Sequence, residues 1–272
     1  MYRSVSCMII CLFFLHSCDQ ESGSFPGKDA PIASIDSSST GQLGIQLRFY
    51  PDSPALRLRY AGSLEKEGNI IAAKLELDTL VVMDSASAFL RYRRAQILLK
   101  SGDTLHAIDD LKMASLLDPG RSGVILELGN IYADQKDARV LSLADTLISR
   151  TADPDMQSRG LLLKGIYYSN TGNKSMALKQ YEESINHNYT FIDAFIEKGI
   201  VLYELRRYPE ALKTFQRGLN VKSTHAELYL WSAKCLQAMG RKEEALDSYR
   251  KSLGLDDQLT EAHEAIRLLE AK

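Results

Sequence analysis

Cysteine, proline and tryptophan are scarce in this chain of 272 residues, which holds four cysteines, seven prolines and one tryptophan. Few prolines and little strand-type alternation of apolar with polar residues favour a helical protein. The net charge is −2, so the composition carries no signal for nucleic acid or another polyanionic partner. The hydrophobic share of 45% is nevertheless that of a globular protein, and the chain is long enough to bury a sizeable core.

Residues arranged for catalysis or metal binding are also missing from the sequence. After residue 18 no histidine stands at metal-ligand spacing from another histidine or a cysteine. The chain has no G-x-S-x-G nucleophile motif. We therefore expect no catalytic residue, no metal, no cofactor and no small-molecule substrate. A cell-envelope hydrolase or sugar-binding protein is the alternative from another class, and it would need a cleft of convergent polar groups that we cannot assemble from these residues.

The apolar run at the N-terminus extends from Cys7 to Leu15. It is shorter than the roughly 20 residues that span a bilayer, and it fits the central region of a secretory signal peptide. The sequence Leu15-His16-Ser17-Cys18 resembles the bacterial lipoprotein signal, in which a small residue precedes a cysteine that becomes lipidated and N-terminal. We predict a lipoprotein signal peptide at residues 1–17 and lipidation of Cys18. An ordinary signal peptide is the alternative.

Residues 18–53 are predicted to consist of the lipidated Cys18 and a flexible linker. Residues 19–43 are rich in Ser, Gly, Asp and Pro, a composition that cannot bury enough apolar surface to fold. Such a segment would tether the lipidated cysteine to the folded domain. Two interpretations of the stretch Gly41–Tyr50 remain: it is a short strand-like segment, or it is a segment docked before the first helix.

Cysteine usage agrees with an exported, lipidated chain. Cys7 and Cys11 would leave with the signal peptide and Cys18 would carry the lipid, so that Cys235 alone remains. No intrachain disulfide is then available. We expect Cys235 to lie inside a helical hairpin as a small apolar residue.

A repeat of 34 residues runs through the remainder of the chain. Three segments align without gaps at that step, 158–191, 192–225 and 226–259, and two more share the frame at 54–87 and 88–121. Close helix crossings require small residues, and two places of the repeat supply them. The eighth place is small in all six repeats: Ala61, Ala95, Gly129, Gly165, Gly199 and Ala233. The twentieth place is alanine in five of them: Ala73, Ala107, Ala177, Ala211 and Ala245. Glycine falls where first helices should end, at residues 68, 102, 172 and 240.

Residues 122–157 form a degenerate repeat of 36 residues. Leu141 stands at its twentieth place, and Asp145 stands at the twenty-fourth, where the other repeats have a large apolar residue. We expect its second helix, at about residues 138–149, to pack irregularly or to change the superhelical pitch. Residues 260–272 carry an apolar stripe opposite a charged face, which predicts a capping helix.

The pattern is similar to that of the tetratricopeptide repeat (TPR) family, whose 34-residue helix–turn–helix motif has small residues at the eighth and twentieth places. The resemblance covers residues 54–259. It implies an all-α fold, a right-handed TPR solenoid of about six helix–turn–helix repeats with a C-terminal capping helix. Together with the N-terminal signal, it indicates a bacterial TPR-containing lipoprotein.

The same resemblance implies a concave groove lined by the first helices. The fifth place, which faces that groove in the family, is apolar in all six repeats: Leu58, Tyr92, Leu126, Leu162, Ile196 and Leu230. Members that grip the terminal carboxylates of a peptide carry lysine there, so this carboxylate clamp is not expected here. We predict a groove that seats an apolar partner segment, with these residues in repeats four to six: Leu162, Ile166, Ile196, Ile200, Tyr203, Leu230 and Trp231. The alternative is that several of them pack against the neighbouring hairpin.

Arginines gather on the first helices of the first two repeats, at positions 57, 59, 91, 93 and 94. They would favour an acidic partner or anionic lipid head groups, or else form a solvated face whose stems cover apolar surface.

Taken together, the patterns predict a non-enzymatic protein–protein interaction scaffold of the bacterial cell envelope. It would bind a protein or peptide partner in its groove and attach to the membrane through its lipid anchor. It would bind no nucleic acid. A cytoplasmic TPR adaptor, with an N-terminus that is not a signal, is the alternative.

Overall fold

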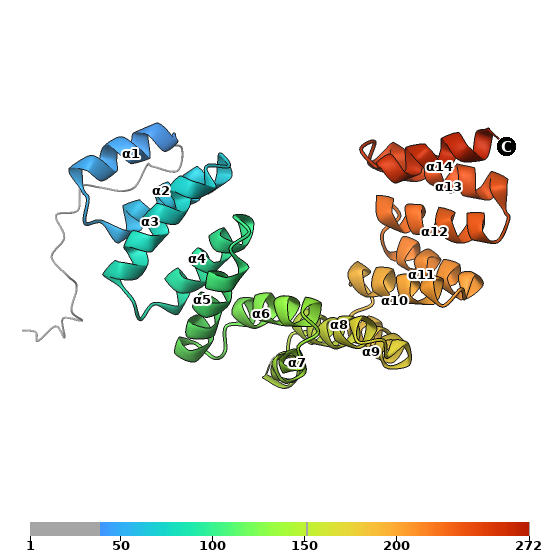
Figure 1. Ribbon diagram of the computed structural model, residues 1–272, viewed down its shortest axis with the longest axis horizontal. Coiled ribbons are helices and arrows are strands. Elements are labelled where there is room, and N and C mark those ends of the chain that lie inside the picture. The colour runs from blue at the N-terminus through green and yellow to red at the C-terminus, as the bar shows by residue number, and fades with distance from the viewer. Residues whose placement is uncertain (1–38, 151, 272) are drawn as a thin grey trace, which may run out of the picture. The chain divides into compact units, whose positions relative to one another are not determined.

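The computed structural model describes residues 39–150 and 152–271, and within them it contains fourteen helices and no strand (Figure 1). The predicted signal peptide and Cys18 lie outside the described residues. The helices are α1 (Thr40–Phe49), α2 (Pro54–Lys66), α3 (Ile70–Met83), α4 (Ala88–Lys100), α5 (Thr104–Leu117), α6 (Ser122–Asp134), α7 (Arg139–Arg150), α8 (Pro154–Asn170), α9 (Lys174–His187), α10 (Ile192–Glu204), α11 (Tyr208–Val221), α12 (Ala226–Ala238), α13 (Lys242–Leu255) and α14 (Thr260–Glu270).

Helices α2 to α13 form six consecutive hairpins, and each hairpin packs against the next. This confirms the predicted all-α repeat fold. Local signals set where the first helices begin: the Ser53 hydroxyl accepts a hydrogen bond from the Leu56 amide, and Pro54 opens α2. None of the described helices is long and apolar enough to cross a bilayer.

The small residues of the eighth place lie under large side chains of the second helix. A Cβ atom added to Gly199 would come within 2.2 Å of the Phe215 ring, and one added to Gly165 within 2.3 Å of the Tyr181 ring. Phe215 and Tyr181 occupy the twenty-fourth place of their repeats and are fully buried. The small residues at the eighth place and the large residues at the twenty-fourth place therefore form one contact between the two helices of a hairpin.

The predicted linker, residues 18–53, does not extend over its C-terminal part, because Thr40–Phe49 forms helix α1, which agrees with the interpretation of a segment docked before the first helix. Leu43 and Leu47 lie one helical turn apart and are buried, and α1 packs against α2. The Thr40 hydroxyl also donates to Glu67 Oε1 at 2.5 Å. Helix α1 covers the side of α2 on which no earlier repeat lies, so the segment gains its helical structure from this docking.

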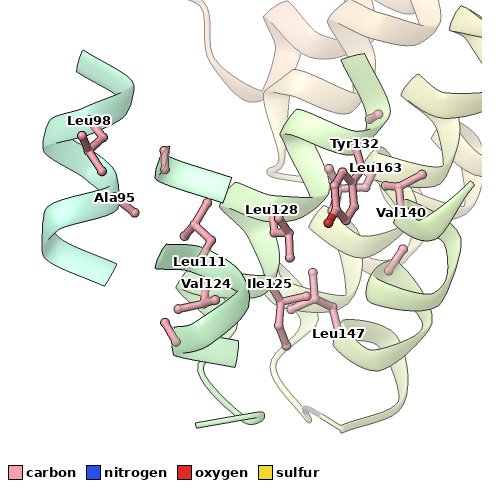
Figure 2. Close-up of a cluster of buried hydrophobic side chains, with 14 residues drawn as sticks. Ala95, Leu98, Leu111, Val124, Ile125, Leu128, Tyr132, Val140, Leu147 and Leu163 are labelled. Carbon is pink, nitrogen blue, oxygen red and sulfur yellow. The ribbon is translucent and has the colours of Figure 1, made fainter. Parts of the chain in front are cut away.

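The third repeat is irregular, as expected, but in a different register from the one predicted. Val140, Ala144 and Leu147 are buried in α7, with Val140 and Ala144 one residue before the expected places of Leu141 and Asp145. Figure 2 shows Val140 and Leu147 in a buried cluster with Leu128, Tyr132 and Leu163. The Asp145 side chain is 65% exposed and pairs with Lys164 Nζ at 2.5 Å. Ala144 is therefore the small residue of this helix.

Helix α8 also begins earlier than the predicted fourth repeat, at Pro154 rather than at residue 158. The contact between α8 and α7 is more extensive than the contact between α6 and α7, and α8 also contacts α6 directly. A Cβ atom on Gly160 would lie 2.9 Å from the Ala144 carbonyl oxygen, so glycine permits this close approach.

At the C-terminal end, α14 packs on α13, and Ala262 is buried in the same cluster as Tyr249 and Leu236.

Candidate interaction surface

The seven predicted groove residues lie on the first helices α8, α10 and α12, and the structure divides them. Ile196 and Leu230 are only 6% and 7% exposed, since they pack into the core cluster of the last two repeats. For these two residues the burial agrees with the alternative, that several of the predicted groove residues pack against the neighbouring hairpin. The other five are half-buried: Leu162, Ile166, Ile200, Tyr203 and Trp231. Neighbouring hairpins cover more of this surface than the resemblance alone implies.

Trp231 is held in place by several residues of its own fold. Its ring stacks on Phe215 at a centroid distance of 6.1 Å and meets Tyr203 edge-on at 5.6 Å. The ammonium of Lys234 lies 3.9 Å from the indole centroid, and the indole nitrogen donates to Glu227 Oε1 at 3.3 Å. The ring is thus fixed in one orientation while part of it stays exposed, which suits an anchor for a partner.

Carboxylates that the predicted set of groove residues does not include occupy the same surface. Burial raises the pKa of Glu197, and four acidic neighbours from three helices add to the rise, in the order Glu227, Asp193, Glu204 and Asp134. A clue was present in the sequence, because Asp193, Glu197 and Glu227 stand at the second and sixth places, which face the groove in the family. The prediction took only apolar and aromatic residues of the first helices and left the acidic ones out.

An open pocket of ≈ 480 Å³ lies at the start of α12, next to this acidic surface. Leu230 and Leu259 form apolar walls, while Glu227 and Asp256 contribute carboxylates. The side chain of Leu230 is therefore core on one side and pocket wall on the other.

The arginines of the first two repeats are mostly neutralised inside the fold. Arg94 binds Asp110 at 2.6 Å, Arg93 binds Glu65 at 2.7 Å, and Arg57 binds Glu76. The hydrogen bonds that Arg94 donates to Asp110 raise the pKa of its guanidinium further. These arginines act between helices of the fold, which agrees with the structural alternative rather than with a surface for an acidic partner.

Residues 39–150 and 152–271 offer no metal site. No cluster of three or more His, Cys, Asp and Glu side chains in this part of the chain is placed to hold a metal ion. Cys235 is free and buried inside the last hairpin, as predicted, and burial raises the pKa of its thiol to about 12.

Known proteins resemble the chain in one repeat by sequence and in the whole solenoid by structure. The tetratricopeptide repeat model matches residues 226–259. A tetratricopeptide repeat protein from Parabacteroides merdae has a TM-score of 0.68 at 15% identity, over 85% of this chain and 91% of that one. PilW, a widely conserved type IV pilus biogenesis factor, has a TM-score of 0.64 at 15% identity, over 79% and 97%. Comparison with curated proteins gave no match.

At such identities the likeness to solved structures establishes the fold. It is a solenoid of stacked helical hairpins, each of which contacts its neighbours in sequence. One repeat thus matches the tetratricopeptide repeat model, and the six hairpins have the fold of solved tetratricopeptide repeat structures.

Proposed function

We propose that the chain is a non-enzymatic interaction scaffold of the bacterial cell envelope, anchored to the membrane through a lipid on Cys18. It binds a segment of a partner protein on the first-helix face of repeats four to six. The observation that carries the proposal is the aromatic pair of Tyr203 and Trp231, in which Trp231 stacks on Phe215 while both rings stay partly exposed. Rigid aromatic side chains lose little conformational entropy on binding, so they make strong anchors.

Co-purification from solubilised membranes, followed by identification of the bound proteins, tests the surface. The variant Tyr203→Ala with Trp231→Ala is expected to lose its partner while keeping its helical circular dichroism. The matched control is Tyr189→Ala, which removes an aromatic ring that is 71% exposed in the loop between α9 and α10. Equal recovery of the partner by all three chains would count against this surface.

The anchor is tested separately, on the mature protein. Mass spectrometry should find an acylated N-terminal Cys18, and the Cys18→Ser variant should move from the membrane to the soluble fraction, because buried acyl chains supply the membrane affinity. A mature chain that retains Met1 would instead favour the cytoplasmic adaptor.

A further inference from the structure

Four acidic side chains on the first helices of repeats three, five and six form no ion pair within the described part of the chain. Among the residues that the structure describes, Asp134, Asp193, Glu197 and Glu227 make no ion pair, although they come from three different helices, α6, α10 and α12. Like charges held close together cost free energy in the folded state. A cationic ligand would offset that cost.

The lysines on the neighbouring elements are already paired with other residues. Lys174 binds Glu204 at 2.6 Å, and Lys234 binds Glu261 at 2.7 Å while its ammonium lies over the Trp231 ring. The excess negative charge between α6 and α12 is therefore a property of the folded surface, and the fold itself does not relieve it.

A buried hydroxyl without a hydrogen-bond partner lies beside the same carboxylates. Tyr181 is fully buried, Ser169 approaches its hydroxyl without the geometry of a hydrogen bond, and Glu197 and Glu204 are the charged groups that act on it. The equivalent hydroxyl two repeats later, of Tyr249, donates to Gln237 Oε1 at 2.6 Å. Buried polar groups are normally satisfied. The unsatisfied hydroxyl thus lies near Glu197, and the described part of the fold supplies it with no hydrogen-bond partner.

The pocket at the start of α12 has the shape and chemistry to take a long basic side chain. Leu230 and Leu259 offer apolar walls for an alkyl stem, and Glu227 and Asp256 offer carboxylates for the charged end. Lysine and arginine place an apolar stem and a cationic head in this way. Glu227 belongs both to the pocket and to the acidic group around Glu197, so the two features are continuous.

We infer that the partner segment bound by this surface is basic, with a lysine or arginine seated between Glu227 and Asp256 and further basic side chains along Glu197, Asp193 and Asp134. The inference rests on the proposed function, and it names the chemistry of the partner. Tyr203, Trp231 and Ile200 supply the apolar contacts, and the carboxylates select the sign of the charge. This is opposite in sign to a lysine-lined clamp for peptide carboxylates.

Fluorescence anisotropy with a labelled synthetic peptide of alternating lysine and leucine tests the inference on the chain that carries residues 19–272. The comparison peptide has glutamate in place of each lysine. The key variant is Glu197→Gln with Glu227→Gln, in which the amide oxygen introduced at position 227 can still accept a hydrogen bond from the indole. The control is Asp109→Asn with Glu243→Gln, which changes the net charge equally on the second helices α5 and α13.

The lysine peptide should bind the unmodified chain more tightly than the glutamate peptide, and its affinity should fall as salt is raised. The key variant should lose about tenfold or more of this affinity, whereas the control variant should keep it. Circular dichroism should show that the key variant folds normally, because it removes repulsion between like charges.

Three results would overturn the inference: no preference for the lysine peptide, no binding of it, or an equal loss in both variants. The natural partner separates this inference from the proposed function. If the partner co-purifies equally with the unmodified chain and the key variant, the basic-segment inference fails and the scaffold function stands. If the unmodified chain captures no partner, the scaffold function itself fails.

Discussion

One residue in each hairpin, between the first and second helix, has a left-handed backbone. In four repeats it is glycine, with φ values from 74° to 86°, and in the other two it is Lys136 and Arg206, with φ of 57° and 58°. All six stand at the fifteenth place of their repeats. Because a Cβ atom disfavours this conformation, the third and fifth repeats store strain that the others avoid.

Replacing Arg206 with glycine should therefore raise the free energy of unfolding by up to about 1 kcal/mol, measured by urea titration. The converse change, Gly172→Ala, forces a side chain into the same conformation at φ 86° and should lower stability by about 1 kcal/mol. Nothing else lies within 4 Å of a Cβ atom added there, so the backbone alone is tested. A lower free energy of unfolding in the Arg206→Gly variant would contradict backbone strain at this position.

At the scale of elements, each hairpin depends on how closely its two helices approach. In the fifth repeat the Phe215 ring lies on Gly199, and in the fourth the Tyr181 ring lies on Gly165. The third repeat uses a different solution, since α7 is shifted by one residue and Gly160 brings it close to α8 instead. The contact between helices, rather than the sequence frame, decides which residues of α7 are buried.

Gly199→Ala should destabilise the chain by about 2–3 kcal/mol, because its new methyl group would overlap the Phe215 ring in a packed core. Gly62→Ala is the matched control in another first helix, where nothing lies within 4 Å of the added Cβ atom. It should stabilise by about 0.5–1 kcal/mol, the usual helical preference for alanine over glycine. Thermal unfolding followed by circular dichroism measures both, and similar effects of the two changes would contradict this packing.

For the whole molecule, repeats interact with their neighbours in sequence, so stability is distributed along the chain. The end repeats need covers, and the structure supplies two: α1 on α2, and α14 on α13. Trp231, the one tryptophan of the chain, lies in the last repeat and reports on that end.

Deletion of residues 260–272 should destabilise the last repeat by about 3 kcal/mol, because the apolar contacts of Ile266 and Leu269 with the core are lost. Tryptophan fluorescence should then report unfolding at a lower urea concentration than circular dichroism does, since the chain no longer unfolds in one step. Deletion of residues 1–50, which removes α1, should leave the tryptophan transition unchanged. A single coincident transition in the chain that lacks α14 would argue against independent repeats.

Sequence alone determined the repeat and most of its register. The first helices begin at residues 54, 88, 122, 192 and 226, where the spacing of small residues places the repeats, because caps, turn glycines and helix crossings act over a few residues. The lipid anchor and the groove's role in binding stay predictions.

Tertiary structure decided what no local pattern contains. Helix α1 exists because Leu43 and Leu47 find a surface on α2, and Ile196 and Leu230 are buried because neighbouring hairpins cover them. The acidic group around Glu197 assembles from α6, α10 and α12, which are distant in the sequence. Exposure and electrostatic interaction depend on how helices cross, so the folded chain alone decides which carboxylates act on one another.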